Sequence, residues 1–182
     1  MFVQTEITPN PNALKFLPGK KVSIEGSFEI TKKEEIDNDL VRNLLSINGV
    51  TGVFLGADFI SINKSENIEW DEIKHIAISL INDFYSTGKE CVIENNFTKE
   101  KNKDLKLIEI EKKIIKILDT KIRPAVAKDG GDIKFKEFNE GVVKVELQGS
   151  CSGCPSSTMT LKQGVENLLK HYLPEVKEVV AN

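Results

Sequence analysis

The chain has 182 residues, of which 40% are hydrophobic and 29% are charged, a size that suits one globular domain or two small ones. Its formal net charge of −3 argues against a nucleic-acid-binding protein, because no basic excess is present to replace the counterions around phosphates. No apolar run approaches the roughly 20 residues that span a bilayer, and the first residues lack a secretory apolar core. We therefore expect a soluble intracellular protein with neither nucleic acid nor membrane as a partner.

The first half of the chain alternates between strand and helix patterns. Apolar runs at residues 3–7 and 13–17 are separated by two prolines and two asparagines, which predicts a hairpin. Residues 39–45 carry one apolar helical face, and an Asn-Gly pair soon after them is typical of a helix end. Residues 52–63 contain two apolar runs split by Gly-Ala-Asp, which predicts two strands and a tight turn. Residues 70–85 repeat apolar side chains every three or four positions, which predicts an amphipathic helix.

The second half begins after a change of composition. Residues 89–104 are polar, rich in asparagine and without periodicity, which indicates a linker. A long amphipathic helix is predicted from residue 107, and Pro124 is expected to end or bend it. A turn at residues 129–132 leads into strands at 133–138 and 142–148, a helix at 155–171 and a strand at 176–180. The predicted fold is α+β with two small domains, residues 1–88 and 105–182, the second ordered helix-strand-strand-helix-strand.

The chain has three cysteines: Cys91, Cys151 and Cys154. So small and odd a number does not suit the disulfide framework of a small secreted domain. Cys151 and Cys154 lie where a predicted strand ends and a predicted helix begins. Two thiolates at this spacing can reach one metal centre, and Gly149 and Gly153 let the backbone bend closely around a bulky ligand. The free amides of the first helical turn favour thiolates and a negatively charged cluster. The pair is therefore a candidate site for an iron-sulfur cluster.

The number of thiolates predicts a dimer. A 2Fe-2S or 4Fe-4S cluster normally takes four thiolates, whereas Cys151 and Cys154 supply two. Two chains would complete the set, with the cluster at their interface and its assembly coupled to dimerisation. A cluster held between separable chains can also be handed on. Cys91 stands alone in the predicted linker and is a poor candidate for a ligand.

Spacing alone leaves three interpretations of Cys151 and Cys154 at similar weight: half a zinc site, a dithiol redox pair and a cluster site. The zinc interpretation lacks a second pair, since His75 and His171 lie in predicted helices as ordinary histidines do. A thioredoxin-like dithiol-disulfide oxidoreductase would place its pair after the first strand of a larger sheet, whereas this pair follows a two-strand hairpin. No histidine is placed beside a serine or cysteine to suggest nucleophilic catalysis.

Four polar residues near the cysteines have ordinary explanations. Asp129 and Asp132 flank two glycines, and turn chemistry explains that pattern better than metal binding does. Ser156 and Ser157 are expected to satisfy amides of the first helical turn rather than bind cluster sulfides. None of the four is therefore predicted to be a ligand.

Several segments resemble one known family. IRPAVAKDGGDI at residues 122–133 and LQGSCSGCPS at 147–156 resemble the C-terminal domain of NifU. TPNPNALKFLPG at residues 8–19, VFLGADFISINK at 53–64 and the helix that begins at Trp70 resemble the N-terminal domain of Nfu-type proteins. The resemblance covers nearly the whole chain except the linker. It implies an iron-sulfur scaffold or carrier without enzymatic turnover, which receives a 4Fe-4S cluster from the general assembly machinery and passes it to apoproteins.

The resemblance also implies the ligands and partners. Cys151 and Cys154 are implied to bridge two protomers through the cluster, with 2Fe-2S as the alternative to 4Fe-4S, while Cys91 has no counterpart in the family pattern. The expected partners are recipient apoproteins, upstream cluster-assembly proteins and a second copy of the chain, with a monomer in the absence of the cluster. No arginine-rich presequence precedes Thr5, so a bacterial cytoplasm is expected, and the mitochondrial matrix is the alternative for a processed organellar protein.

Overall fold

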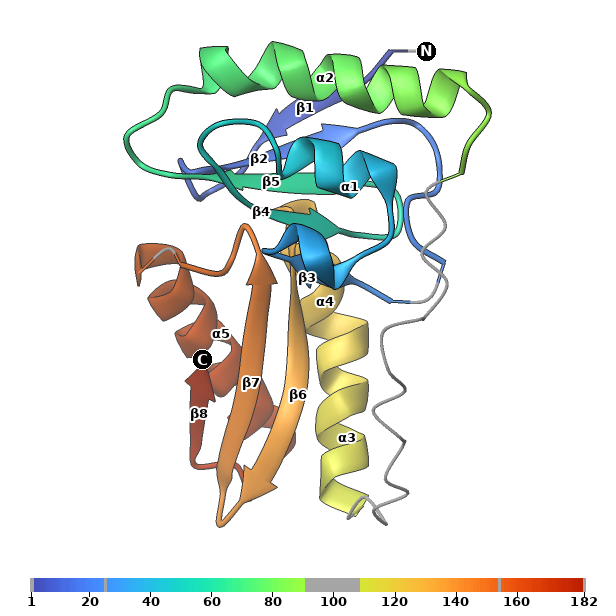
Figure 1. Ribbon diagram of the computed structural model, residues 1–182. Coiled ribbons are helices and arrows are strands. Elements are labelled where there is room, and N and C mark those ends of the chain that lie inside the picture. The colour runs from blue at the N-terminus through green and yellow to red at the C-terminus, as the bar shows by residue number, and fades with distance from the viewer. Residues whose placement is uncertain (1, 25, 91–108, 154, 182) are drawn as a thin grey trace.

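The computed structural model describes residues 2–24, 26–90, 109–153 and 155–181, which build two sheets. One end of the smaller sheet is directed at a face of the larger sheet (Figure 1). The N-terminal region, residues 2–90, contains a five-stranded sheet in the order β1-β2-β5-β4-β3. The C-terminal region, residues 109–181, contains a three-stranded sheet in the order β6-β7-β8. Helices and strands therefore combine within each region, and the predicted α+β class is confirmed.

The N-terminal region follows the predicted order with one added strand. Its predicted elements are β1 (Gln4–Ile7), β2 (Ala13–Leu17), α1 (Asp39–Leu44), β4 (Val50–Leu55), β5 (Ile60–Lys64) and α2 (Trp70–Ser86). Two elements were not predicted: strand β3 (Phe28–Ile30) and η1 (Lys33–Glu35), a 3-10 helix of one turn. Three residues are too few to show an alternating pattern, and β3 exists because it pairs antiparallel with β4 at the sheet edge.

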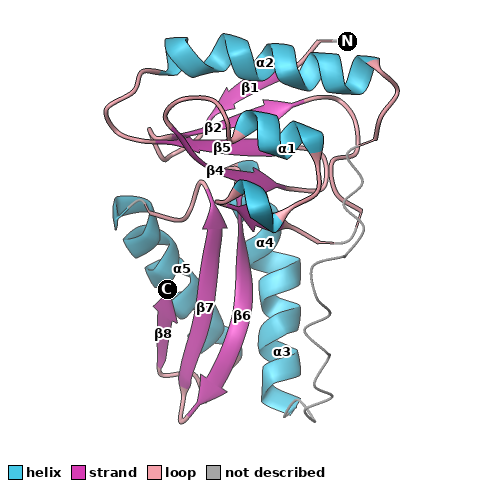
Figure 2. Cartoon of the chain, in the orientation of Figure 1, coloured by secondary structure: helices cyan, strands magenta, loops and turns pink. Residues whose placement is uncertain are grey.

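The two faces of the five-stranded sheet have different neighbours. Helices α1 and α2 cover one face (Figure 2), where Phe16, Leu55 and Ile62 are buried in the larger core. Side chains alternate along a strand, so Lys15 and Ser61 emerge on the opposite face. That second face is turned toward the C-terminal region, and both of these polar side chains are buried there.

A continuous helical segment opens the C-terminal region. It consists of α3 (Glu109–Ile117), one π-helical turn η2 (Leu118–Ile122) and α4 (Arg123–Lys128). Pro124 was expected to end or bend this helix, yet the segment continues to Lys128. The proline lies in the first turn of α4 directly after the wider π turn, where its missing amide hydrogen is tolerated.

The remaining C-terminal elements match their predictions closely. They are β6 (Gly131–Asn139), β7 (Val142–Gly149), α5 (Pro155–Tyr172) and β8 (Glu178–Ala181). β6 and β7 form the predicted hairpin, and the crossover through α5 brings β8 back parallel to β7. Apolar side chains of α3, α4 and α5, including Ile114, Val126 and Leu169, bury the second core against this sheet. No helix in the described part of the chain is long and apolar enough to cross a membrane.

Candidate functional site

Cys151 lies two residues after the end of β7, and 6% of its surface is exposed. It belongs to the core of the C-terminal region rather than to an open loop. The backbone of Gly131 lies against its sulfur: a Cβ placed on Gly131 would come within 2.7 Å of Cys151 Sγ and 2.6 Å of the Gln148 carbonyl oxygen. Real Cβ atoms do not approach other atoms so closely, so the position of this sulfur depends on a glycine at residue 131.

The turn from Gly149 to Ser152 holds Cys151 between two glycines with left-handed backbone. Gly149 has φ +70° and Gly153 has φ +77°, a conformation that glycine adopts without strain. The Ser152 amide donates to the Gly149 carbonyl oxygen at 3.1 Å, which closes the turn. The bend that these two glycines predicted is therefore present at the cysteine pair.

Cys154 and the side chains of Ser156 and Ser157 lie outside the described residues, as does Cys91. Helix α5 begins at Pro155, so Cys151 lies between β7 and α5, at the predicted junction of strand and helix. The Thr158 hydroxyl donates to the Cys151 carbonyl oxygen at 3.3 Å and ties the first turn of α5 to the loop. The roles expected of the two serines stay predictions.

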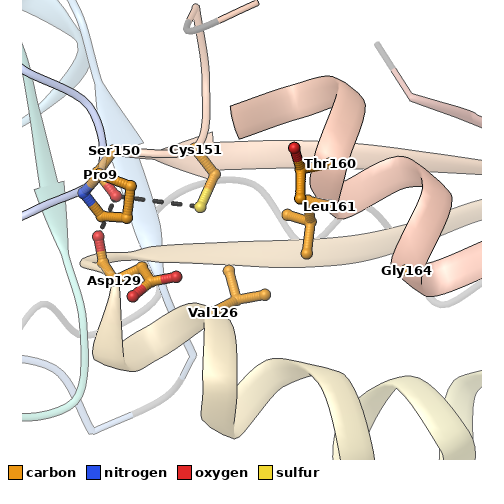
Figure 3. A pocket seen from close by; sticks show the side chains of 8 residues that line it. All are labelled: Pro9, Val126, Asp129, Ser150, Cys151, Thr160, Leu161 and Gly164. Atoms are coloured by element: carbon orange, nitrogen blue, oxygen red, sulfur yellow. Dashed lines mark hydrogen bonds between the residues drawn. The ribbon is translucent and has the colours of Figure 1, made fainter. Parts of the chain in front are cut away.

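A cavity of about 480 Å³ opens beside Cys151. Figure 3 shows its lining, in which the Cys151 sulfur is directed toward the space between α4 and α5. The lining residues come from both regions of the chain: Pro9, Val126, Asp129, Ser150, Cys151, Thr160, Leu161 and Gly164. The thiol is therefore screened by the core on one side and has room on the other.

Asp132 forms an ion pair with Arg123. Nε and Nη2 of Arg123 donate to its two carboxylate oxygens, each at 2.8 Å, and the Ser27 hydroxyl donates to it from the N-terminal region. Burial raises the pKa of Asp132, but the hydrogen bonds from Arg123 and Ser27 outweigh burial and hold the pKa below its ordinary value. The same pairing raises the pKa of Arg123.

Of the other titratable residues singled out from the sequence, Asp129 lines the cavity beside Cys151, and the two histidines lie elsewhere. The Asp129 backbone carbonyl accepts a hydrogen bond from the Ser150 hydroxyl, and this fixes the residue before Cys151. His75 and His171 are exposed on α2 and α5. Among the residues that the structure describes, no three His, Cys, Asp or Glu side chains gather to hold a metal ion.

Glu29 of β3 reaches the cysteine loop from the other region. Its Oε1 accepts a hydrogen bond from the Gly149 amide at 3.3 Å and lies 3.0 Å from the Ser152 hydroxyl. Burial raises the pKa of Glu29, and the hydrogen bonds from Ser152 and Gly149 only partly offset this. No sequence signal could have found this contact, because the two residues are 123 positions apart.

Three more side chains of the N-terminal region contact the loops around Cys151. They donate to backbone carbonyl oxygens: Asn10 to Ser150 at 3.0 Å, Asn63 to Gly149 at 3.3 Å and Ser61 to Gly130 at 2.7 Å. Polar side chains of the N-terminal region thus add hydrogen bonds to the carbonyl oxygens of the loops around Cys151, and those of Gly130 and Gly149 also accept from the Ser150 and Ser152 amides.

Comparison with known proteins identifies the family. A family model described as a NifU-like domain matches residues 114–180, and one described as the N-terminal part of the scaffold protein Nfu/NifU matches residues 3–88. A human protein named "NFU1 iron-sulfur cluster scaffold homolog, mitochondrial" is 42% identical over 181 residues, which cover 98% of this chain and 71% of that protein. The chain belongs to the Nfu family of NifU-like proteins. The resemblance predicted from its motifs is confirmed.

This Nfu chain is also similar to a plant protein and to one solved structure. "NifU-like protein 4, mitochondrial" from Arabidopsis thaliana is 42% identical over 184 residues, 98% of this chain and 65% of the relative, so the chain spans about two thirds of that protein. A solution structure of a NifU-like protein from Saccharomyces cerevisiae is 29% identical, covers 50% of this chain and 84% of its own, and superposes with a TM-score of 0.46.

Proposed function

We propose that this chain is an iron-sulfur cluster scaffold and carrier, without enzymatic turnover, whose cargo is held by Cys151 and Cys154. The observation that carries the proposal is the placement of Cys151 at the junction of β7 and α5. There its sulfur is seated on the Gly131 backbone and directed toward a cavity. The chain's membership of a family whose curated relatives are named iron-sulfur cluster scaffolds supports the same cargo.

The cluster that we propose is 4Fe-4S, bound between two chains, with 2Fe-2S as the alternative. Each chain supplies two thiolates from its Cys-x-x-Cys segment, so two chains supply the four that a cluster takes. The start of α5 next to the segment favours the negative charge of a thiolate-ligated cluster. Without its cargo the chain is expected to be a monomer.

Transfer from such a site is ligand exchange. Thiolates of a recipient apoprotein replace those of Cys151 and Cys154 one iron-sulfur bond at a time, and no electrons need to move. The partners are therefore recipient apoproteins, the assembly proteins that load the cluster and a second copy of the chain. The curated relatives are named as mitochondrial, and this favours the mitochondrial alternative over a bacterial cytoplasm. Residues 1–88 and 105–182 are proposed as the two domains.

Anaerobic reconstitution with ferrous iron and sulfide tests the function. The full chain should become brown with broad visible absorbance, and Cys151→Ser and Cys154→Ser should abolish the colour. Cys91→Ser is the matched control and should keep it. Native mass spectrometry should find two chains per cluster, and one chain per intact cluster would contradict the bridging arrangement. A colourless chain that reduces disulfides would instead establish the dithiol-disulfide oxidoreductase alternative.

A further inference from the structure

Strand β3 carries one acidic side chain into the C-terminal region. Ile30 of β3 is buried in the core under the helices, so Glu29, its neighbour along the strand, emerges on the opposite face of the sheet. That face covers the cysteine loop, and Glu29 is half-buried against it. The five-stranded sheet thus holds the carboxylate in place, whereas the cysteine loop extends from the three-stranded sheet.

The contact with Glu29 spans the turn that carries Cys151. One oxygen, Oε1, accepts from the Gly149 amide at the first residue of the turn and lies within reach of the Ser152 hydroxyl at the last. The Ser152 hydroxyl also lies 2.8 Å from the Gly149 carbonyl oxygen, so its single proton is shared between the two acceptors. Both ends of the turn are therefore hydrogen-bonded to one atom outside the turn, Oε1 of Glu29.

We propose that Glu29 is a positioning residue for the cluster ligands, which fixes the turn from Gly149 to Ser152 and with it the sulfur of Cys151. The use of that sulfur rests on the proposed function, but the positioning itself can be measured without a cluster. Glu29 acts through the Ser152 hydroxyl and the Gly149 amide.

The contact is separable from the general packing of the two regions. Lys15 donates to the Lys128 carbonyl oxygen at 3.3 Å, and Lys134 donates to the Ser27 carbonyl oxygen at 3.0 Å. These bonds hold the two regions together at other points. Removal of the Glu29 carboxylate should therefore loosen the turn without separating the regions.

Two substitutions separate positioning from charge. Glu29→Gln keeps an acceptor oxygen at the same place and removes only the negative charge, whereas Glu29→Ala removes both. Ser152→Ala removes the hydroxyl on the loop side and leaves the N-terminal sheet untouched. Glu66→Ala is the matched control, because Glu66 is an acidic residue that lines one polar groove together with Glu29 and Ser152.

The first measurement is the rate at which iodoacetamide alkylates Cys151 in the reduced full chain carrying Cys91→Ser and Cys154→Ser. Glu29→Ala should raise the rate roughly 5- to 30-fold, the range that the loss of one or two hydrogen bonds gives. Ser152→Ala should raise it in the same direction, while Glu29→Gln and Glu66→Ala should stay within about twofold of the parent. Circular dichroism should show each variant folded.

The second measurement is the lifetime of the reconstituted cluster against a chelator in chains that keep all three cysteines. Glu29→Ala should shorten it, and Glu29→Gln should not. An unchanged alkylation rate in both Glu29→Ala and Ser152→Ala would overturn the proposal, as would a rise in Glu29→Gln equal to that in Glu29→Ala. If no chain takes up a cluster, the proposed function fails, but the alkylation rates still decide the role of Glu29.

Discussion

Gly131→Ala is the sharpest test of how the cysteine is seated. The added Cβ would lie 2.7 Å from the Cys151 sulfur, 3.2 Å from its Cβ and 2.6 Å from the Gln148 carbonyl oxygen. The last of these atoms is backbone in β7, so rotating a side chain cannot relieve the clash. The hairpin must shift where Gly131 pairs with Gly149, and the turn that carries the thiol must shift with it.

The expected loss in the free energy of unfolding follows from overpacking. An extra carbon in a filled site costs about 1–3 kcal/mol. The reduced freedom of the unfolded chain gives back about 0.4–1 kcal/mol when alanine replaces glycine. The difference spans about 0–2.6 kcal/mol, and because one of the clashing atoms is backbone we expect the upper part, about 1–2.6 kcal/mol. This corresponds to a fall in Tm of about 2–10 °C for a chain of this size. We also expect less cluster to be retained after reconstitution, because Cys151 is displaced.

Thermal unfolding of the cluster-free chain and cluster content after reconstitution measure the two effects. Gly164→Ala is the control for the Tm alone, because Gly164 also lines the cavity beside Cys151. This glycine is exposed on α5, and a Cβ there meets nothing within 4 Å. Alanine in the helix should leave the Tm unchanged or raise it, since glycine is about 1 kcal/mol less favourable there. A Gly131→Ala chain with the parent's Tm and cluster content would refute the close seating of the sulfur.

Two further predictions concern the contacts around the cysteine loop. The pKa of Asp132 is lowered in the folded chain by Arg123, so its ion pair stabilises the fold above the unfolded pKa of about 3.9 and is lost as the pH falls through the folded value. Asp132→Asn should therefore destabilise the chain at pH 6 in urea unfolding and much less at pH 3, and an equal difference at both would contradict this. Ser61→Ala should cost about 0.5–1.5 kcal/mol in the same assay, because it removes one buried hydrogen bond from the Gly130 carbonyl, which keeps the Ser150 amide as its other donor. The control Ser79→Ala, on an exposed face of α2, should cost almost nothing.

The elements around the cysteines could be predicted because their signals are local. The alternation of apolar and charged side chains in residues 142–148 predicted a strand there, after the strand predicted at 133–138. The glycines and the proline around Cys151 indicated the junction with α5. Strand β3 could not be predicted, since its three residues become a strand only by pairing with β4. The contact of Glu29 with the loop depends on that strand, so it too was out of reach of any local pattern.

The Asp-Gly-Gly-Asp segment shows where local reasoning was incomplete. A turn was predicted for residues 129–132, and Gly130 does turn the chain with φ +82°. Gly131 already belongs to β6 and supports the Cys151 sulfur, while Asp132 binds Arg123 and Ser27. Glycine and aspartate are common in turns for reasons of their own. That common explanation concealed two tertiary roles that only the packing of distant residues could reveal.

Under the proposed function, there is a physical reason for contacts that hold the cysteine loop from outside the loop. The turn consists of glycines, serines and Cys151, so it has little apolar surface with which to order itself. Besides the burial of Cys151 in the core, its order comes from hydrogen bonds made by Asp129, Thr158 and Glu29, none of which involves a cluster. A ligand held in place before its cargo arrives loses less conformational entropy on binding. It also keeps its position when the cargo leaves, so the same chain can be loaded again.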